Sequence, residues 1–426
     1  MLLSIPLRRM IQIGTFTLID AAGRTHRFEG RQPGGAVTVK LHDKALHRRL
    51  LFNAHVAVGE AYMNGTLTIE EGTLYDFLHL MMENIAAAPR GGADTFSRRL
   101  DYMLRWIHQF NPRSRARKNV AHHYDLSSTL YDLFLDADRQ YSCAYFENPD
   151  DTLETAQANK KRHLAAKLLL QPGLKALDIG SGWGGLALYL ADETGVDVTG
   201  LTLSTEQVKL AQERAAKAGI SDQVRFRLQD YREEKSRYDR IVSVGMFEHV
   251  GVLHYQEYFD KIAELLTADG VAVIHTVGRS EGPGTMNPWL RKYIFPGAYA
   301  PALSEILGPV ERSGLVVTDI EVLRLHYAET LRHWRRRFTA NRDRIRAIYD
   351  ERFCRMWEFY LTSTELAFRV DRFVVFQLQL TKPGHSFPAT RDYITDWEVS
   401  RQASSEETSA IASQQSEQPR YARASE

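Results

Sequence analysis

The stretch Lys175–Gly185, which reads KALDIGSGWGG, decides the fold of this chain. A short apolar run interrupted by Asp178 is followed by four glycines, and an amphipathic segment begins directly afterwards at residues 186–194. This layout predicts a buried strand, a tight turn and the start of a helix. Glycine is needed there because the turn uses backbone angles that a Cβ disfavours and because a ligand touches the main chain. The ligand is expected at the carboxyl edge of a parallel sheet.

Two kinds of nucleotide ligand bind to such a turn, a dinucleotide or S-adenosylmethionine. Gly180, Gly182 and Gly185 match the dinucleotide pattern G-x-G-x-x-G, which is weak by itself. A dinucleotide fold also needs an acidic residue at the end of the second strand, about 20 residues further on, to bind the ribose. The second strand is predicted at 197–203 and ends in Thr202 and Ser204, so this acid is missing.

The alternative pattern is D-x-G-x-G-x-G, which Asp178 and the glycines form, and which is typical of S-adenosylmethionine (SAM) methyltransferases. Asp230, after the apolar segment 224–228, offers an acceptor for an adenine amino group. The sequence therefore favours SAM. A nicotinamide or flavin cofactor and a purely structural glycine turn remain the alternatives.

The composition limits the classes of protein to which this chain can belong. The 426 residues include 54 Lys and Arg against 53 Asp and Glu, so the global charge indicates no nucleic-acid partner. The two cysteines, Cys143 and Cys354, do not suggest a disulfide framework and favour a cytoplasmic setting. No apolar run is long enough to span a bilayer, and no metal-binding spacing occurs.

We expect four regions along the chain. Residues 1–88 form a small N-terminal α/β domain, with strands at 14–20 and 36–41, helices at 44–53 and 74–85, and a short strand-rich segment at 62–71. A packing or docking role is favoured for it over a second active site. Residues 89–118 form a basic linker with a helix at 96–110, which is either a solvated surface or a membrane-binding face. Residues 119–384 form the catalytic domain, and 385–426 a disordered tail.

The catalytic region alternates strands with helices. Strands are predicted at 176–178, 196–201, 224–228, 239–244, 270–275, 316–323 and 372–380, and helices at 153–170, 205–218, 254–266, 327–349 and 353–368. This alternation predicts an α/β fold with a doubly wound, mainly parallel, Rossmann-like sheet. Glu248, His249 and His275 follow predicted strands of this sheet, and Cys143 lies in a segment expected to cap the cofactor. A Glu and a His at the mouth of such a sheet favour a catalytic site.

Eight motifs in order carry a family resemblance: HHYDLS (122–127), YSCAYF (141–146), LDIGSGWGG (177–185), GLTLSTEQ (200–207), QDYR (229–232), FEHVG (247–251), HTVGR (275–279) and FCRMWEFYL (353–361). With them the chain resembles the cyclopropane-fatty-acyl-phospholipid synthases, a family that includes the mycolic acid cyclopropane synthases. One departure is Ser181, where many members carry Cys. The family's second strand ends without an acid, which accounts for the missing carboxylate.

The resemblance implies an activity. Such enzymes transfer the methyl group of SAM to a cis double bond in a phospholipid acyl chain and then remove a proton to close a cyclopropane ring. A bound bicarbonate ion is thought to act as base, held at positions that match Cys143, Glu248, His275, Val277 through its backbone, and Tyr327. Cys354 matches a position once regarded as an active-site thiol, although a thiol nucleophile has no obvious step in this reaction. The implied SAM contacts are Tyr141, Ser142, Asp178, Gly180, Ser181, Gly182, Trp183, Gly184, Thr202, Leu203, Ser204, Gln207, Asp230 and Tyr231.

The chemistry sets further expectations. An alkene is a poor nucleophile, so the methyl donor must be positioned against it and water kept from the resulting carbocation. Aromatic faces stabilise a cation without reacting, and the candidates are Phe247, Tyr145, Trp289, Tyr327 and Trp357. Glu248 is expected to orient a protonated partner or hold the bicarbonate proton, and His275 to be a switchable donor.

The expected setting is the inner face of an anionic membrane, where the basic stretches 98–118 and 332–346 dock a homodimer peripherally. Three alternatives remain open. The same scaffold makes methylene- or methyl-branched chains, or the chain is a small-molecule N- or O-methyltransferase, or it is a non-catalytic SAM-binding protein.

Overall fold

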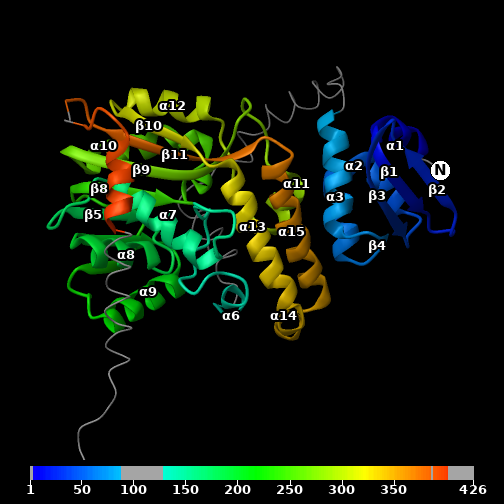
Figure 1. Ribbon diagram of the computed structural model, residues 1–426, viewed down its shortest axis with the longest axis horizontal. Coiled ribbons are helices and arrows are strands. Elements are labelled where there is room, and N and C mark those ends of the chain that lie inside the picture. Colours follow the sequence, from blue (N-terminus) through cyan, green and yellow to red (C-terminus); the bar gives the residue numbers. More distant parts are fainter. Residues whose placement is uncertain (1–2, 88–127, 385–386, 402–426) are drawn as a thin grey trace, which may run out of the picture.

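The structure is a computed structural model that describes residues 3–87, 128–384 and 387–401 (Figure 1). A large unit is built around a seven-stranded sheet, and a small N-terminal unit around a four-stranded sheet. The predicted basic linker, its helix at 96–110 and the HHYDLS motif lie outside the described residues.

The N-terminal unit is a small mixed sheet flanked by helices. Its strands have the order β2-β1-β3-β4, with β1 parallel to β3 and antiparallel to β2, and β3 antiparallel to β4. Its elements are α1 (Ser4–Met10), β1 (Ile13–Ile19), β2 (Thr25–Glu29), β3 (Gln32–Leu41), α2 (Leu46–Met63), β4 (Leu67–Glu71) and α3 (Leu74–Ala87).

The first half of the large unit alternates strands and helices. Its elements are α6 (Ser128–Asp132), α7 (Leu153–Lys167), β5 (Lys175–Ile179), α8 (Gly185–Thr194), β6 (Asp197–Thr202), α9 (Thr205–Ala218), β7 (Val224–Leu228), η1 (Tyr231–Glu233) and β8 (Tyr238–Val244).

The second half adds the antiparallel edge and the long helices. Its elements are η2 (Phe247–His249), η3 (Val252–His254), α10 (Tyr255–Leu265), β9 (Leu266–Arg279), α11 (Pro288–Tyr293), α12 (Leu303–Arg312), β10 (Val316–Val322), α13 (Arg324–Ala340), α14 (Arg342–Ile348), α15 (Glu351–Arg369) and β11 (Phe373–Thr381). Residues 392–401 form a further helix.

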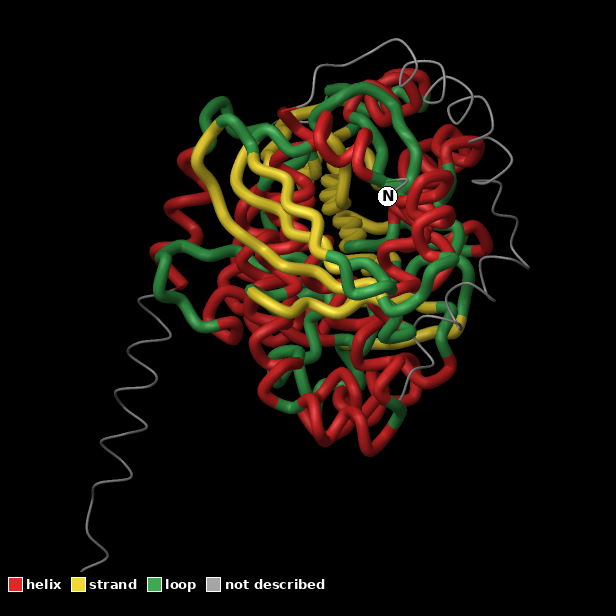
Figure 2. Tube along the Cα trace, turned by 90° about the vertical axis from the view of Figure 1, so that its right-hand side faces the viewer, coloured by secondary structure: helices red, strands yellow, loops and turns green. Residues whose placement is uncertain are grey.

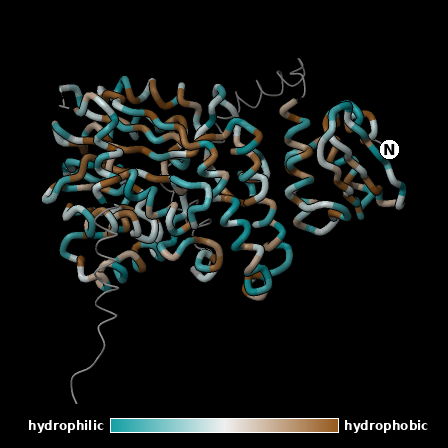
Figure 3. Tube along the Cα trace, in the orientation of Figure 1, coloured by the Kyte–Doolittle hydropathy of each residue, from teal (hydrophilic) through white to brown (hydrophobic). Residues whose placement is uncertain are grey.

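The large sheet has the strand order β10-β11-β9-β8-β5-β6-β7. Strands β5 to β9 are parallel, whereas β10 and β11 run antiparallel at one edge. Helices α8 and α9 lie on one face and α10 and α12 on the other (Figure 1). Figure 3 shows apolar residues concentrated in the central strands, as expected for a sheet covered on both faces. The predicted doubly wound, mainly parallel sheet is confirmed.

The N-terminal unit packs on the large unit through α2 and α3, which both lie against α15, while α2 also contacts α11 (Figure 1). Figure 2 turns the molecule so that the N-terminal unit faces the viewer. The Trp289 indole N–H contacts the Met63 sulfur at 3.2 Å, and the Tyr62 hydroxyl donates to Glu358 Oε2 at 3.1 Å. A Cβ at Gly59 would lie 2.4 Å from Trp289 Nε1, so only glycine permits this approach.

Three sequence predictions are wrong in detail. The helix predicted at 44–53 continues to Met63 across a kink at Asn53 (φ −149°), so strand β4 begins only at Leu67, and β2 was not predicted. The helix predicted at 327–349 breaks at Asn341 into α13 and α14. The region predicted as a disordered tail contains a helix at residues 392–401, which buries Ile394, and residues 402–426 lie outside the described residues.

Within the described ranges, no helix has both the length and the apolar character needed to cross a bilayer.

Candidate active site

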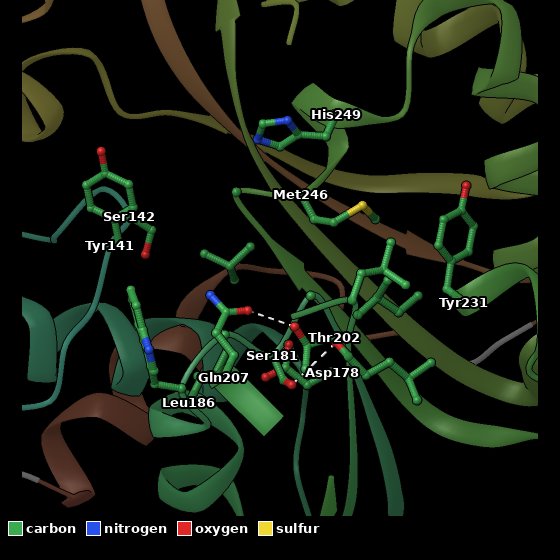
Figure 4. Close-up of a pocket in the computed structure, with 18 of the residues that line it drawn as sticks. Tyr141, Ser142, Asp178, Ser181, Leu186, Thr202, Gln207, Tyr231, Met246 and His249 are labelled. Atoms are coloured by element: carbon green, nitrogen blue, oxygen red, sulfur yellow. Dashed lines mark hydrogen bonds between the residues drawn. The ribbon is translucent and has the colours of Figure 1, made fainter. Parts of the chain in front are cut away.

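A cavity opens at the carboxyl ends of β5, β6 and β8, where the strand order of the large sheet reverses (Figure 4). Of the fourteen residues predicted to bind SAM, only Gly184 and Ser204 do not line it. Ser204 instead caps α9, its hydroxyl accepting from the Gln207 N–H at 3.3 Å. The lining residues that were predicted are Tyr141, Ser142, Asp178, Gly180, Ser181, Gly182, Trp183, Thr202, Leu203, Gln207, Asp230 and Tyr231.

The glycine turn after β5 uses left-handed backbone at Gly180, Gly182 and Gly184, with φ of +86°, +53° and +84°. A Cβ at Gly184 would lie 2.6 Å from Phe226 Cζ, so this glycine is needed for packing rather than for ligand contact. A Cβ at Gly182 would meet no atom within 4 Å, so the backbone there is open to a ligand in the cavity.

Asp138 lies beside the start of α8. A Cβ at Gly185, the first residue of α8, would lie 2.5 Å from Asp138 Oδ2, although Asp138 does not line the cavity. Burial acts to raise the pKa of Asp138, but Lys161 and Arg214 outweigh it and hold this pKa below its usual value. Because this carboxylate packs so close to the helix start, only a residue without a Cβ fits at position 185.

The end of β6 carries no acid, as the sequence indicates. The Thr202 hydroxyl donates to Gln207 Oε1 at 2.7 Å, and both side chains line the cavity (Figure 4). Asp230 lines it as well, and its carboxylate accepts from Arg232 at the backbone N (3.0 Å), Nε (2.8 Å) and Nη2 (2.6 Å). Much of its acceptor capacity is thus used within the protein, and its contact with adenine stays a prediction.

Glu248 and Val277, both predicted at the catalytic centre, are in contact. Glu248 Oε1 accepts from the Val277 backbone N–H at 2.5 Å, whereas Oε2 has no hydrogen-bond partner among the described residues. Burial raises the pKa of Glu248 to about 7, against the opposing effect of the Val277 N–H. A carboxyl group in this state is a proton donor or acceptor near neutral pH.

His275 lies two residues before Val277 on β9 and is 2% exposed. Its Nδ1 lies 3.2 Å from Gln377 Nε2 on β11, and burial lowers the pKa of His275 to about 3. The prediction of a pH-switchable donor is therefore wrong, because the ring stays neutral. When Gln377 donates to Nδ1, the ring carries its proton on Nε2 and remains a donor there.

Cys143 and Tyr327 are joined through α13. The buried Cys143 thiol contacts the Ala144 carbonyl at 3.3 Å, and burial raises the pKa of this thiol. The Ala144 N–H donates at 3.0 Å to the Thr330 hydroxyl, which lies one helical turn from Tyr327. Tyr327 packs edge-on to Trp334, with ring centroids 5.9 Å apart.

The predicted aromatic residues fall into separate clusters. Trp334 stacks on Tyr141 of the cavity wall at 5.0 Å, so Tyr327 belongs to an aromatic group next to the cavity. Trp357 joins this group through Phe134, which packs on both Trp357 and Tyr141. The other three lie elsewhere: Phe247 packs on Tyr255, Trp289 on the N-terminal unit, and Tyr145 between His163 and His326.

Cys354 lies in the contact between α14 and α15, where its sulfur is 3.9 Å from the Arg342 carbonyl. Burial raises the pKa of its thiol. None of the six residues predicted as catalytic (Cys143, Glu248, His275, Val277, Tyr327 and Cys354) lines the cavity itself.

Sequence reasoning missed several lining residues, notably Gln140, Gln229 and Met246. His249, which the sequence placed at the mouth of the sheet without a binding role, also lines the cavity, and burial lowers its pKa to about 4. Gln140 follows Arg139, a non-glycine residue with φ of +54°, and such strained backbone is concentrated at functional sites. No local sequence pattern predicts that conformation.

Residues 111–378 match the family described as mycolic acid cyclopropane synthetase. The chain belongs to this family. It is 35% identical to the cyclopropane-fatty-acyl-phospholipid synthase of Escherichia coli (strain K12) over 348 residues, which are 81% of this chain and 87% of that protein. It is 40% identical over 285 residues to a probable fatty acid methyltransferase of Pseudomonas putida, covering 64% and 72% of the two chains.

Solved structures agree with this membership. The mycolic acid cyclopropane synthase CmaA1, in complex with SAH and CTAB, is 34% identical with a TM-score of 0.60, covering 64% of this chain and 99% of that chain. This member of the cyclopropane synthetase family is therefore a SAM-dependent methyltransferase, and its relatives support methylation or cyclopropanation of lipid acyl chains. The cavity fits SAM, since open backbone at Gly182 and polar side chains from four segments converge on it.

Proposed function

We propose that this enzyme converts the cis double bond of a phospholipid acyl chain into a cyclopropane ring. The observation that carries the proposal is Glu248, a buried carboxyl with one oxygen unpartnered among the described residues, whose other oxygen accepts from the N–H of Val277, two residues beyond the neutral His275 on β9. A carboxyl group in such a dry setting suits removal of one proton from a hydrocarbon cation.

SAM, when bound, supplies the methyl group. The chain's own residues have to orient the donor and exclude water. Tyr141 lines the cavity, and behind it Trp334, Tyr327 and, through Phe134, Trp357 form an aromatic group that suits a dry site and a positive charge. The Tyr141 hydroxyl forms a hydrogen bond with the Tyr360 hydroxyl at 2.8 Å, and this bond holds the Tyr141 ring in place.

We propose bicarbonate as the group that supplies the base. Cys143, Glu248, His275 and Tyr327 would hold it, as the resemblance implies. Glu248 fits this role because a carboxyl with a pKa of about 7 is partly protonated at neutral pH and donates to an anion instead of repelling it. The Val277 N–H is already donated to Glu248, so Val277 acts by fixing that carboxyl.

The test uses Glu248→Gln and His275→Gln. Each should reduce turnover at least about 100-fold, the usual contribution of a proton-transfer group, while the dissociation constant of S-adenosylhomocysteine measured by calorimetry stays unchanged. Loss of cofactor affinity in step with activity would reject the assignment.

A second candidate is a methyl- or methylene-branched product, which the probable fatty acid methyltransferase among the relatives favours. Mass spectrometry of fatty acids from expressing cells should show monounsaturated chains that gain one CH2 group. NMR then separates the products, because only a ring gives cyclopropane protons and only a methylene branch gives olefinic ones.

We propose that the enzyme docks on anionic membranes. The ion pairs of the structure favour a different docking surface from the one predicted from the sequence. In the predicted basic stretch 332–346, five of the seven arginines pair with carboxylates of the protein, which reduces the net positive charge offered to lipid: Arg332, Arg335, Arg337, Arg342 and Arg346. The kink of α2 offers a better surface. Phe52 is 83% exposed and Leu51 41%, next to Arg48, which is exposed and has no ion pair among the described residues.

An exposed aromatic beside an exposed arginine suits insertion into an anionic interface. Phe52→Ser and Arg48→Glu should each weaken sedimentation with phosphatidylglycerol vesicles, and added salt should weaken binding of the unmodified enzyme. Leu325→Ser is the matched control, since Leu325 is 55% exposed on α13. Equal losses for all three variants would refute docking at α2.

We also propose a homodimer, on the family resemblance alone. Light scattering of the purified chain tests it.

A further inference from the structure

Lys160 is a buried cation that the proposed chemistry does not use. It lies on α7, is 0% exposed, and no carboxylate of a described residue forms an ion pair with its ammonium group. Its Nζ donates to Gln140 Oε1 at 2.6 Å and to Ser142 Oγ at 2.8 Å. Both acceptors belong to side chains that line the cofactor cavity.

The direction of these hydrogen bonds is fixed, because an ammonium group only donates. Gln140 must present its oxygen to Lys160, and its Nε2 donates to Asp138 at 3.0 Å. One turn earlier on α7, Gln157 Nε2 donates to the carbonyls of Gln140 and Ser142, at 3.2 and 3.0 Å. The Ser142 hydroxyl, which accepts from Lys160, therefore keeps its own proton to donate elsewhere.

The nearby acidic groups do not neutralise Lys160 fully. Asp138 is paired with Lys161 and Arg214, and Asp136 accepts from the backbone N–H groups of residues 138 and 140. Burial raises the pKa of Asp178 to about 7, with Lys160 opposing this rise. A buried positive charge without an ion-pair partner is costly, and a ligand anion would offset that cost.

Ser142 and Tyr231 lie on opposite sides of the cavity (Figure 4). Asp230 and Tyr231 at one side suit the flat adenine ring. The Ser142 side, with a hydroxyl donor backed by an ammonium group, suits a carboxylate. In SAM, adenine and the methionyl carboxylate are at opposite ends of the molecule.

We propose that Lys160 is a positioning residue that fixes the Ser142 hydroxyl as a donor to the methionyl carboxylate of SAM and supplies the charge this carboxylate needs. The inference rests on SAM binding and not on the proposed ring closure. It also differs from a role toward bicarbonate, which would leave cofactor affinity unchanged.

Binding of two ligands to the full chain tests this, in buffer freed of bicarbonate and without lipid. S-adenosylhomocysteine keeps the amino-acid portion, whereas methylthioadenosine lacks it. Lys160→Met should weaken the first about 10- to 100-fold, the range for a lost hydrogen bond to a charged group, and leave the second unchanged. Lys209→Met, an exposed lysine on α9, is the control and should change neither.

Ser142→Ala is a second variant for the same binding experiment, and it keeps the test valid if Lys160→Met does not fold. It should also weaken S-adenosylhomocysteine selectively, and the double variant should lose less than the sum of the two single losses, because both act on one contact. Equal weakening of both ligands, unchanged S-adenosylhomocysteine affinity, or additive losses would each overturn the proposal. Failure of cyclopropane formation would not affect it.

Discussion

Glu248→Gln is expected to lower turnover and, at the same time, to make the free energy of unfolding less sensitive to pH. The Glu248 carboxyl is buried, and burial raises its pKa from 4.5 to about 7. The folded state therefore prefers the protonated form. The contribution of this carboxyl to the free energy of unfolding is therefore complete below the unfolded pKa of 4.5 and is lost as the pH rises through about 7. Glu248→Gln has the same shape and cannot ionise, so it removes this pH-dependent loss.

The magnitude follows from the two pKa values. At 1.36 kcal/mol per pKa unit, the rise from 4.5 to about 7 corresponds to about 3 kcal/mol in total. About 2 kcal/mol of this falls between pH 5.5 and 8.5. Any constant effect of the amide, such as an unpartnered NH2 group in place of Oε2, is the same at both pH values and cancels in the difference.

The assay is urea unfolding of both proteins at pH 5.5 and 8.5, followed by tryptophan fluorescence. The free energy of unfolding of Glu248→Gln relative to the unmodified enzyme should increase by about 2 kcal/mol between these values. Glu213→Gln, at an exposed position on α9, should show no such change. A difference that is constant with pH would show that Glu248 is not held protonated by burial, and the proposed proton-donor role would fall with it.

Three further outcomes follow from the packing. His163 bridges Glu321 and Glu398; burial lowers its pKa, but these carboxylates outweigh it and raise the pKa above 6.5. His163→Gln should therefore destabilise by about 2 kcal/mol at pH 5 and by less as the pH rises past the raised pKa, with Trp397 fluorescence reporting release of the 392–401 helix. Gly59→Ala should cost about 1–3 kcal/mol by overpacking the α2–α11 contact, whereas Gly35→Ala, with open space at its Cβ, should stay within about 0.5 kcal/mol in thermal unfolding. Cys354→Ser should keep turnover while losing about 1–3 kcal/mol of stability; a loss of activity without a loss of stability would restore a catalytic role for this thiol.

Most residues predicted to bind the cofactor line one cavity, because that end of the site is local in sequence. The glycine turn, the Thr202 to Gln207 segment and the Asp230 region each follow directly from a strand, so the positions of their backbones follow from the strand order of a parallel sheet. The protonation states of the residues predicted as catalytic are harder to predict from sequence, because they depend on burial. His275 looked like a pH switch in sequence and is a neutral ring in the fold, since β11 covers it with Gln377.

Aromatic residues show the same limit. Composition identified Tyr145, Trp289 and Phe247 as equivalent to Tyr327 and Trp357, although the first three pack in other parts of the molecule. Likewise, the arginines of 332–346 looked like a basic surface, but three of the seven pair with carboxylates from other helices. Periodicity gives the face of a helix and not the partner that covers it.

By itself, the sequence determined the α/β alternation, the left-handed glycine turn and the preference for SAM, because these follow from backbone sterics and from residues adjacent in the chain. The tertiary structure alone decided that Asp138 lies beside Gly185, that Glu248 meets Val277, and that the buried Lys160 donates to Ser142. These contacts join segments 18 to 47 residues apart, as Lys160–Ser142 and Asp138–Gly185 do. Their pKa values and charges depend on what excludes water around them, which no local pattern contains.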